Sequence, residues 1–213
     1  MNQVHEWGGL LYLLYFLDMP ADRTAIITLP HPSLRQRSER VHVITDDTVS
    51  LIEDMRAAAL DWEDSRPHEI AVALAAVQID RLERIVIVRS NFEDKADRNF
   101  TVLINPEISK TEGELVTDHE GCLSVTGVYG AVPRWSRIRM KALDEQGREV
   151  RVKADGFLAR VLQHEVDHTN GLCFIDHIEH QRDAFFILKD NGELEATSYE
   201  TVEDLKIFRD DTV

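Results

Sequence analysis

Residues 155–171 read DGFLARVLQHEVDHTNG, and the rest of the chain is organised around this stretch. It begins with a residue type that caps helix N-termini and ends in Asn-Gly, a typical stop signal, so it predicts one helix. His164 and His168 lie at positions i and i+4 of that helix. Both imidazoles therefore project from one face and can bind the same ion.

Glu165 follows the first histidine directly, at the edge of the same face. The resulting H-E-x-x-H pattern supplies two metal ligands and a general base that acts on a metal-bound water. The alternative is a pair of buried or solvated histidines on an ordinary amphipathic helix. Because the chain has only nine histidines among 213 residues, a chance match is rare and a metal site is the preferred hypothesis.

A catalytic metal site usually has three protein ligands and one open position. Cys122, in the stretch HEGCLSV (119–125), is the strongest candidate for the third ligand. A thiol beside a divalent cation loses its proton readily, and a soft ligand suits zinc or ferrous iron. Glu120 could accept the second ring N–H of a metal-bound histidine or serve no such role, and the sequence leaves both readings open.

Hydrophobic periodicity predicts a second helix from Asp46 or Asp47 to about Trp62, and a helix-like segment from Phe174 to about Lys189. Strands are predicted at 84–89, 101–104, 137–142 and 150–153, the last two joined by a turn at 144–147. The expected fold class is α+β, with mostly antiparallel sheets wrapped around a central metal-binding helix.

Composition limits the classes of function. The net charge of −15 argues against a nucleic-acid or anionic-membrane partner, and 43% hydrophobic residues predict one domain with a real core. The apolar run at 8–16 is too short to span a membrane and lacks a preceding positive charge. Two cysteines fit a reducing compartment such as the cytoplasm. We expect an N-terminal extension or misassigned start at 1–18, a catalytic domain at 19–190 and an acidic tail at 191–213.

Two motifs resemble those of peptide deformylases. The stretch EGCLS at 120–124 resembles the second motif of that family, and QHEVDH at 163–168 resembles the third. The likeness continues through GAVPR at 130–134 and ADGFLAR at 154–160, and covers most of the chain from about residue 26 to residue 174.

The resemblance implies an enzyme that removes the formyl group from formylmethionyl nascent peptides in the cytoplasm, with transient ribosome contact. It also implies one divalent ion, usually Fe²⁺, for which Zn²⁺, Ni²⁺ or Co²⁺ can substitute. The implied metal ligands are Cys122, His164 and His168. The implied catalytic groups are Glu165 as general acid/base and the Gln78 amide and Leu123 N–H as oxyanion donors. The implied substrate-binding residues are Ala73, Gly121 and Arg134.

The chain departs from the family at its first motif. The usual pattern is Gly-x-Gly-Leu-Ala-Ala-x-Gln-x-Gly, whereas residues 71–80 read AVALAAVQID and keep Gln78 without any glycine. From the residues alone, Gln78 could equally make a structural hydrogen bond. Two other functions stay open: an H-E-x-x-H endopeptidase, or a metal- or peptide-binding module without activity.

Overall fold

The computed structural model describes residues 20–66, 69–189 and 191–208. In this part of the chain, seven strands form an antiparallel sheet in the order β1-β2-β3-β4-β6-β7, with β5 paired to β4. The strands are β1 (Ala73–Ala75), β2 (Ile85–Arg89), β3 (Phe100–Cys122), β4 (Val125–Leu143), β5 (Glu149–Asp155), β6 (Phe185–Leu188) and β7 (Leu194–Ala196).

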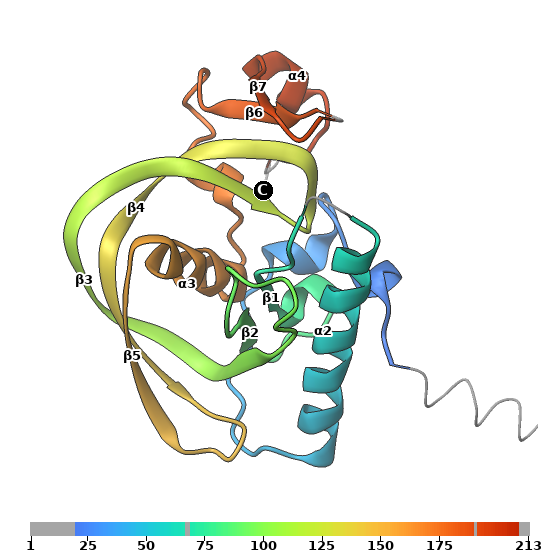
Figure 1. Ribbon diagram of the computed structural model, residues 1–213, viewed down its shortest axis with the longest axis vertical. Coiled ribbons are helices and arrows are strands. Elements are labelled where there is room, and N and C mark those ends of the chain that lie inside the picture. Colours follow the sequence, from blue (N-terminus) through green and yellow to red (C-terminus); the bar gives the residue numbers. More distant parts are fainter. Residues whose placement is uncertain (1–19, 67–68, 190, 209–213) are drawn as a thin grey trace, which may run out of the picture.

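The α-helices are α2 (Asp46–Asp64), α3 (Gly156–Thr169) and α4 (Tyr199–Glu203), and short 3₁₀ helices are η1 (Arg23–Ala25), η2 (Pro32–Arg35), η3 (Ala76–Ile79) and η4 (Phe174–His177). The long strands β3 and β4 curve around α3, while α2 lies on the other side of β1 and β2 (Figure 1). The fold is therefore α+β with a mostly antiparallel sheet around a central helix, as the sequence predicts.

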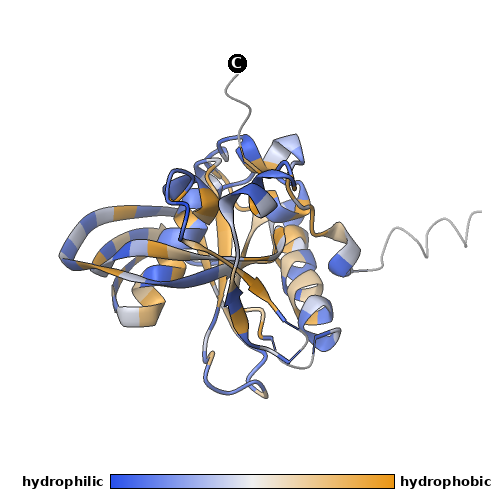
Figure 2. Cartoon of the chain, turned by 90° about the horizontal axis from the view of Figure 1, so that it is seen from above, coloured by the Kyte–Doolittle hydropathy of each residue, from blue (hydrophilic) through white to orange (hydrophobic). Residues whose placement is uncertain are grey.

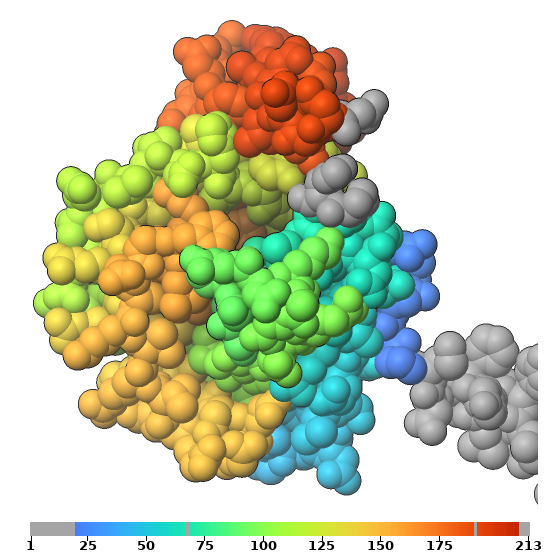
Figure 3. Space-filling view, in the orientation of Figure 1, coloured from blue at the N-terminus to red at the C-terminus, as the bar shows by residue number. Residues whose placement is uncertain are grey.

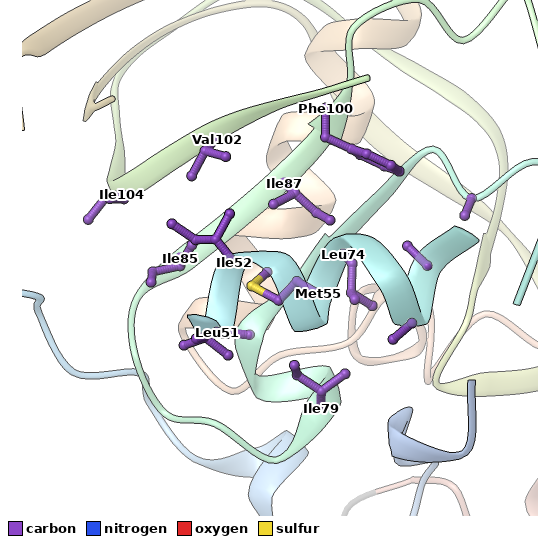
Figure 4. Packing of buried hydrophobic residues seen from close by; sticks show 14 residues of the cluster. Leu51, Ile52, Met55, Leu74, Ile79, Ile85, Ile87, Phe100, Val102 and Ile104 are labelled. Carbon is purple, nitrogen blue, oxygen red and sulfur yellow. The ribbon is translucent and has the colours of Figure 1, made fainter. Parts of the chain in front are cut away.

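Helix α2 begins where the sequence places it, because Thr45 caps its first turn and forms a capping box with Thr48. Its apolar face packs on β2 and the first residues of β3 (Figure 4). The buried side chains of this contact include Leu51, Ile52 and Met55 from α2 and Ile85, Ile87, Val102 and Ile104 from the sheet. This core holds β2 against α2, and with it β1, the edge strand that pairs with β2.

Strand β3 begins at the predicted strand 101–104 but continues to Cys122 as a ribbon with β4. The register of this pair shifts at several points, for example between Glu112 and Leu115 and between Glu120 and Cys122. Such irregularities bend a strand and increase its twist, so the ribbon curves instead of running flat. Hydrophilic and hydrophobic residues alternate along it (Figure 2). The curvature brings the Cys122 end of the ribbon back to α3.

The predicted hairpin before α3 is confirmed. Met140 pairs with Val152 in the β4–β5 ladder, and the turn closes with a hydrogen bond from Asp144 N to Arg148 O. The helix after it, α3, starts at Gly156 with Asp155 as N-cap residue, although the Asp155 side chain makes no capping hydrogen bond. The predicted bounds of this helix are therefore correct. Its first turn follows directly on the end of β5 and has no hydrogen bond from the side chain of its N-cap residue.

The prediction of a helix-like segment from Phe174 to about Lys189 is wrong. This segment contains only the short helix η4, and then β6, which pairs with Val128–Gly130 of β4. The strand forms because β4 offers a free edge there, a long-range partner that local periodicity cannot reveal. After it, β7 and α4 bury Val202 and Ile207 in the same core as Phe185, within the stretch predicted as an acidic tail.

The predicted N-terminal extension at 1–18 lies outside the described residues. Among the residues that are described, none of the helices combines the length and hydrophobicity required to cross a bilayer.

A buried ion pair ties α2 to the strand that leads into the site. The side chains of Glu63 and Arg89 are both fully inaccessible to solvent, and Arg89 Nη2 donates to Glu63 Oε2 at 2.5 Å. Glu63 Oε2 also accepts from Ala71 N at 3.0 Å, and Arg89 N donates to Val72 O at 2.7 Å. The pair therefore sets the position of the backbone immediately before β1.

We expect Arg89→Met to lower the free energy of unfolding by about 3–5 kcal/mol, because Glu63 would remain buried and unpaired. The control is Arg98→Met, which breaks the Arg98–Asp64 pair, whose side chains are 43% and 55% exposed. That change should cost no more than about 1 kcal/mol. Urea denaturation of both variants measures the difference, and equal losses would contradict a special role for the buried pair.

Candidate metal centre and active site

The three predicted metal ligands meet in the structure. Cys122 Sγ lies 3.2 Å from His168 Nε2, which lies 3.1 Å from His164 Nε2. All three ligand atoms fall within 4.8 Å of one another. The helix brings the two histidines together by its i, i+4 spacing, and the curved ribbon brings the cysteine.

The charges of this cluster fit a bound cation. Burial would raise the pKa of the Cys122 thiol, but the adjacent His168 and His164 outweigh burial and lower it. Burial would lower the pKa of His168, and the Cys122 side chain raises it well above its ordinary value. The negative charge of a Cys122 thiolate therefore stabilises positive charge next to it. One thiolate and two imidazoles are also the donor types that zinc and ferrous iron accept.

Glu165 lies next to the three ligands but does not belong to the group whose ligand atoms converge. Its side chain is buried, and Oε2 has no hydrogen-bond partner among the described residues. Burial raises the pKa of Glu165 to about 7. An orphaned buried carboxylate oxygen needs a partner, and a water molecule held by an ion at the cluster would supply one.

Glu120 holds the first histidine in place. Its Oε2 lies 3.0 Å from His164 Nδ1, the ring nitrogen that faces away from the other ligands. Arg134 donates to both carboxylate oxygens, and Arg160 donates to Oε1 at 2.8 Å. Burial opposes ionisation of Glu120, but His164 and Arg134 hold its pKa well below the usual range. A permanently charged carboxylate therefore fixes the tautomer in which Nε2 is free to bind metal.

Gln78 turns its amide nitrogen towards the cluster. Its Oε1 accepts from Ala75 N at 2.8 Å, while Nε2 lies 3.2 Å from Ser124 Oγ and 3.6 Å from Cys122 Sγ. The side chain is buried and lines the cavity. The structure thus shows the structural hydrogen bond of Gln78 and places its amide nitrogen beside the cluster, while its role as an oxyanion donor stays a prediction.

A cavity of about 500 Å³ opens at the cluster. On the face shown in Figure 3, the surface is hollowed below the ribbon, next to α3 (orange). Leu123, Ala73 and Gly121 all line this cavity beside Cys122. Gly121 has no room for a side chain, because a Cβ atom there would lie 2.5 Å from Tyr129 Cε1.

Arg134, predicted to bind substrate, lies elsewhere. It is not among the residues that line the cavity, and its side chain is only 5% exposed. Its guanidinium bonds Glu120 and, at 2.5 Å, Asp167 Oδ2. In this structure Arg134 supports the metal-binding helix instead of facing the cavity.

The structure also brings in residues that sequence reasoning missed. Arg160 reaches Glu120 as well as three backbone carbonyls of the ribbon, including Val132 O at 2.7 Å. Glu69 and Tyr129 line the cavity and bond each other. The sequence does not indicate these contacts, because the residues that form them are far apart along the chain. Cys173 is fully buried, with Sγ 4.0 Å from His168 Nδ1.

Comparisons with known proteins agree with this geometry. A sequence model of the polypeptide deformylase family matches residues 24–184. A peptide deformylase from Thermomicrobium roseum is 44% identical over 157 residues, which cover 72% of this chain and 85% of the relative. One from Halothermothrix orenii is 42% identical over 147 residues, which cover 69% and 88%.

Solved structures give the same result. The crystal structure of a peptide deformylase from Synechococcus elongatus, in complex with actinonin, matches with a TM-score of 0.68 and 32% identity. The match covers 86% of this chain and 88% of that chain. A family match across three quarters of the sequence, close relatives and a shared fold lead to one conclusion: this chain belongs to the peptide deformylase family.

Proposed function

We propose a division of roles among the cavity residues by which this deformylase removes the formyl group from formylmethionyl peptides. The observation that carries it is the pairing of a Cys122/His164/His168 cluster with an unpartnered, buried Glu165 carboxylate oxygen. Hydrolysis of an amide needs an activated water, a group that moves protons, and donors for the developing oxyanion. Each requirement has a candidate in the cavity.

The three ligands would hold one divalent ion, which when bound lowers the pKa of a coordinated water to about 7 and polarises a carbonyl. Glu165 accepts the proton of the attacking water and delivers it to the departing amine. Burial disfavours the charged form of Glu165 and raises its pKa, so this carboxylate accepts a proton more readily than an exposed one would.

The oxyanion donors are the Gln78 amide and the backbone N–H of Leu123. Gln78 is pre-positioned because its oxygen accepts from Ala75 N and its nitrogen donates to Ser124 Oγ beside the cluster. A donor that is fixed before reaction needs no reorganisation when charge develops. Ala73 and Gly121 line the path of the peptide. Arg134 acts on the reaction through Glu120 and is a positioning residue.

Fe²⁺ is the proposed native ion, with Zn²⁺, Ni²⁺ or Co²⁺ as functional substitutes, since a thiolate with two imidazoles accepts each of them. The proposed substrates are nascent chains in the cytoplasm. The family match and the relatives do not favour the H-E-x-x-H endopeptidase or the inactive binding module.

Replacing Cys122, His164 or His168 by Ala should lower metal content well below one ion per chain. Glu120→Gln should weaken metal affinity by about 10- to 100-fold, because His164 loses the charge that orients it. Metal analysis of anaerobically prepared protein and chelator titration measure both effects. Glu107→Gln, an exposed carboxylate on the same strand, is the control. Full metal content in Cys122→Ala would show that the third ligand is assigned incorrectly.

Anaerobically prepared protein should hydrolyse formyl-Met-Ala-Ser, which is the direct test of the function. Glu165→Ala should retain the metal and lose about 10²- to 10⁴-fold in kcat, since only the proton transfer is removed. Release of formate and metal content are measured on the same samples. A wild-type protein that binds metal but releases no formate would contradict the function itself.

Gln78→Leu should lower kcat by about 10²- to 10³-fold with little change in KM, because its donor acts on the oxyanion. Ala73→Gly should leave kcat within a few-fold and mainly change KM, since it only removes a methyl group beside the peptide. Steady-state kinetics on formyl-Met-Ala-Ser separate the two. A nearly silent Gln78→Leu variant would remove this residue from the mechanism.

A further inference from the structure

A row of basic side chains on the ribbon has no part in the mechanism above. The ribbon of β3, β4 and β5 curves around α3, so one face covers the helix and the other faces outward (Figure 1). Along β4, residues 135, 137, 139 and 141 are exposed, whereas those between them are buried or partly buried. Because side chains alternate along a strand, the exposed ones share the outward face. The cations of this face, which we call the basic face, are Lys110 of β3, Arg137, Arg139 and Lys141 of β4, and Arg151 and Lys153 of β5.

Cations of the basic face lie directly opposite one another. Across the β4–β5 ladder, Arg139 is in register with Lys153, and Lys141 is in register with Arg151. On its other side, Arg139 is opposite Lys110 of β3. Like charges at directly opposite positions destabilise a sheet. A bound anion would relieve this repulsion, so the arrangement suits binding better than stability.

Carboxylates neutralise only part of the basic face. Glu112 pairs with Lys110 and Arg139, and Glu149 pairs with Arg151. The remaining three cations form no salt bridge with any residue in the described part of the chain: Arg137, Lys141 and Lys153. They are therefore available to an anionic partner.

The charge of the basic face is opposite to that of the whole chain. Its six cations exceed the four carboxylates that pair with them or lie in register with them, whereas the chain carries −15. These carboxylates are Glu107, Glu112, Glu149 and Asp155. The net charge argues against a nucleic-acid partner for the chain as a whole. At physiological ionic strength, however, exposed charges are screened beyond about 8 Å, so the acids elsewhere act only weakly on an anion bound here.

An aromatic ring lies at one end of the basic face. Trp135 is 38% exposed and precedes Arg137 by two residues, so it shares the outward face. Its backbone is fixed, because Trp135 N donates to Gln163 Oε1 at 3.1 Å and Gln163 Nε2 donates to Trp135 O at 2.9 Å. Proteins that bind single-stranded nucleic acids combine a basic track for the phosphates with aromatic rings on which bases stack. Trp135 and the basic face supply both elements.

We propose that the basic face binds single-stranded RNA, with phosphates along the cations and a base stacked on Trp135. A duplex covers the faces of its bases, so only a single strand can use the ring. A bilayer fits less well, because among the described residues only Leu115 accompanies Trp135 as an exposed large apolar side chain on this face. The binding of a single strand goes beyond the proposed function. Only the choice of RNA over DNA rests on that function, whose substrates are nascent chains.

Fluorescence anisotropy of a labelled oligouridine of about 12 nucleotides tests the binding. The expected Kd near physiological salt is about 10⁻⁶–10⁻⁴ M. The logarithm of the binding constant should fall with the logarithm of the salt concentration with a slope of about −2 to −4, because each contacted phosphate contributes about −0.7. A DNA strand of the same length should bind within a few-fold, since the contacts are made with phosphates and base faces.

Two variants separate the two kinds of contact. Arg137→Gln combined with Lys153→Gln should weaken binding by about tenfold or more and make the salt slope shallower by about 1.4, because two phosphate contacts are lost. Trp135→Ala should weaken binding by about five- to 100-fold without changing the slope. The double variant should unfold at the same temperature as the wild type or a higher one, since Lys153→Gln removes the repulsion from Arg139.

The matched control combines Arg37→Gln with Arg182→Gln, which removes two exposed cations outside the basic face and should leave RNA binding unchanged. An equal loss in the control, a silent Trp135→Ala variant, or a wild-type protein that does not bind the oligouridine at about 50 mM salt would each overturn the proposal. Tighter binding to vesicles of phosphatidylcholine and phosphatidylserine than to RNA, lost in the same variants, would overturn it as well.

Formate release from formyl-Met-Ala-Ser separates this proposal from the proposed function. None of the substituted residues lines the cavity, so every variant should release formate at the wild-type rate. A protein that binds RNA through the basic face but releases no formate would contradict the proposed function alone. An active enzyme that does not bind RNA would contradict the present proposal alone.

Discussion

The carboxylate of Glu120 is the point at which the fold and the site depend on each other. It is almost fully buried, and it lies between His164 and two arginines, Arg134 and Arg160. A buried charge is tolerated only when it is paired and hydrogen-bonded. These partners come from β4 and α3, whereas Glu120 lies near the end of β3. The charge is therefore compensated only when the ribbon closes on the helix, which is the state that also forms the metal site.

The same closure explains why the ribbon is long and irregular. Cys122 must reach two histidines that lie more than 40 residues later in the chain, and the register shifts of β3 and β4 bend the ribbon enough to do so. Arg134 continues the network past Glu120 to Asp167, one residue before His168. The arginine thus ties Glu120 to the turn of α3 that carries His168. Two ligands on a rigid helix and one on a strand end are held by packing and charge before any ion binds.

The parts of this arrangement that sequence predicts are those with local signals. The helix at 155–171 has its own start, stop and periodicity, and the hairpin before it shows alternation around a turn. The chemistry of a thiolate ligand, together with the resemblance of the EGCLS stretch to a family motif, also indicates Cys122 as the third ligand beside this helix. The misassigned segment after Phe174 has no comparable signal, because β6 forms only where β4 provides an edge. The resemblance implies that Arg134 lies near the substrate, whereas its bonds to Glu120 and Asp167 become visible only in three dimensions.

The glycine-free first motif shows which requirements of the site are conformational and which are steric. Asp80, at the last glycine position of the usual pattern, has φ +59° and ψ +30°, a left-handed conformation that Asp tolerates better than most residues. Ala71 and Ala73 are not among the positive-φ residues, so glycine is not needed there for the backbone. Both are nevertheless buried, and Ala73 lines the cavity. The change at Ala73 is therefore one of space in the cavity. The turn after Gln78, which aims the amide at the cluster, keeps the conformation that a glycine would allow.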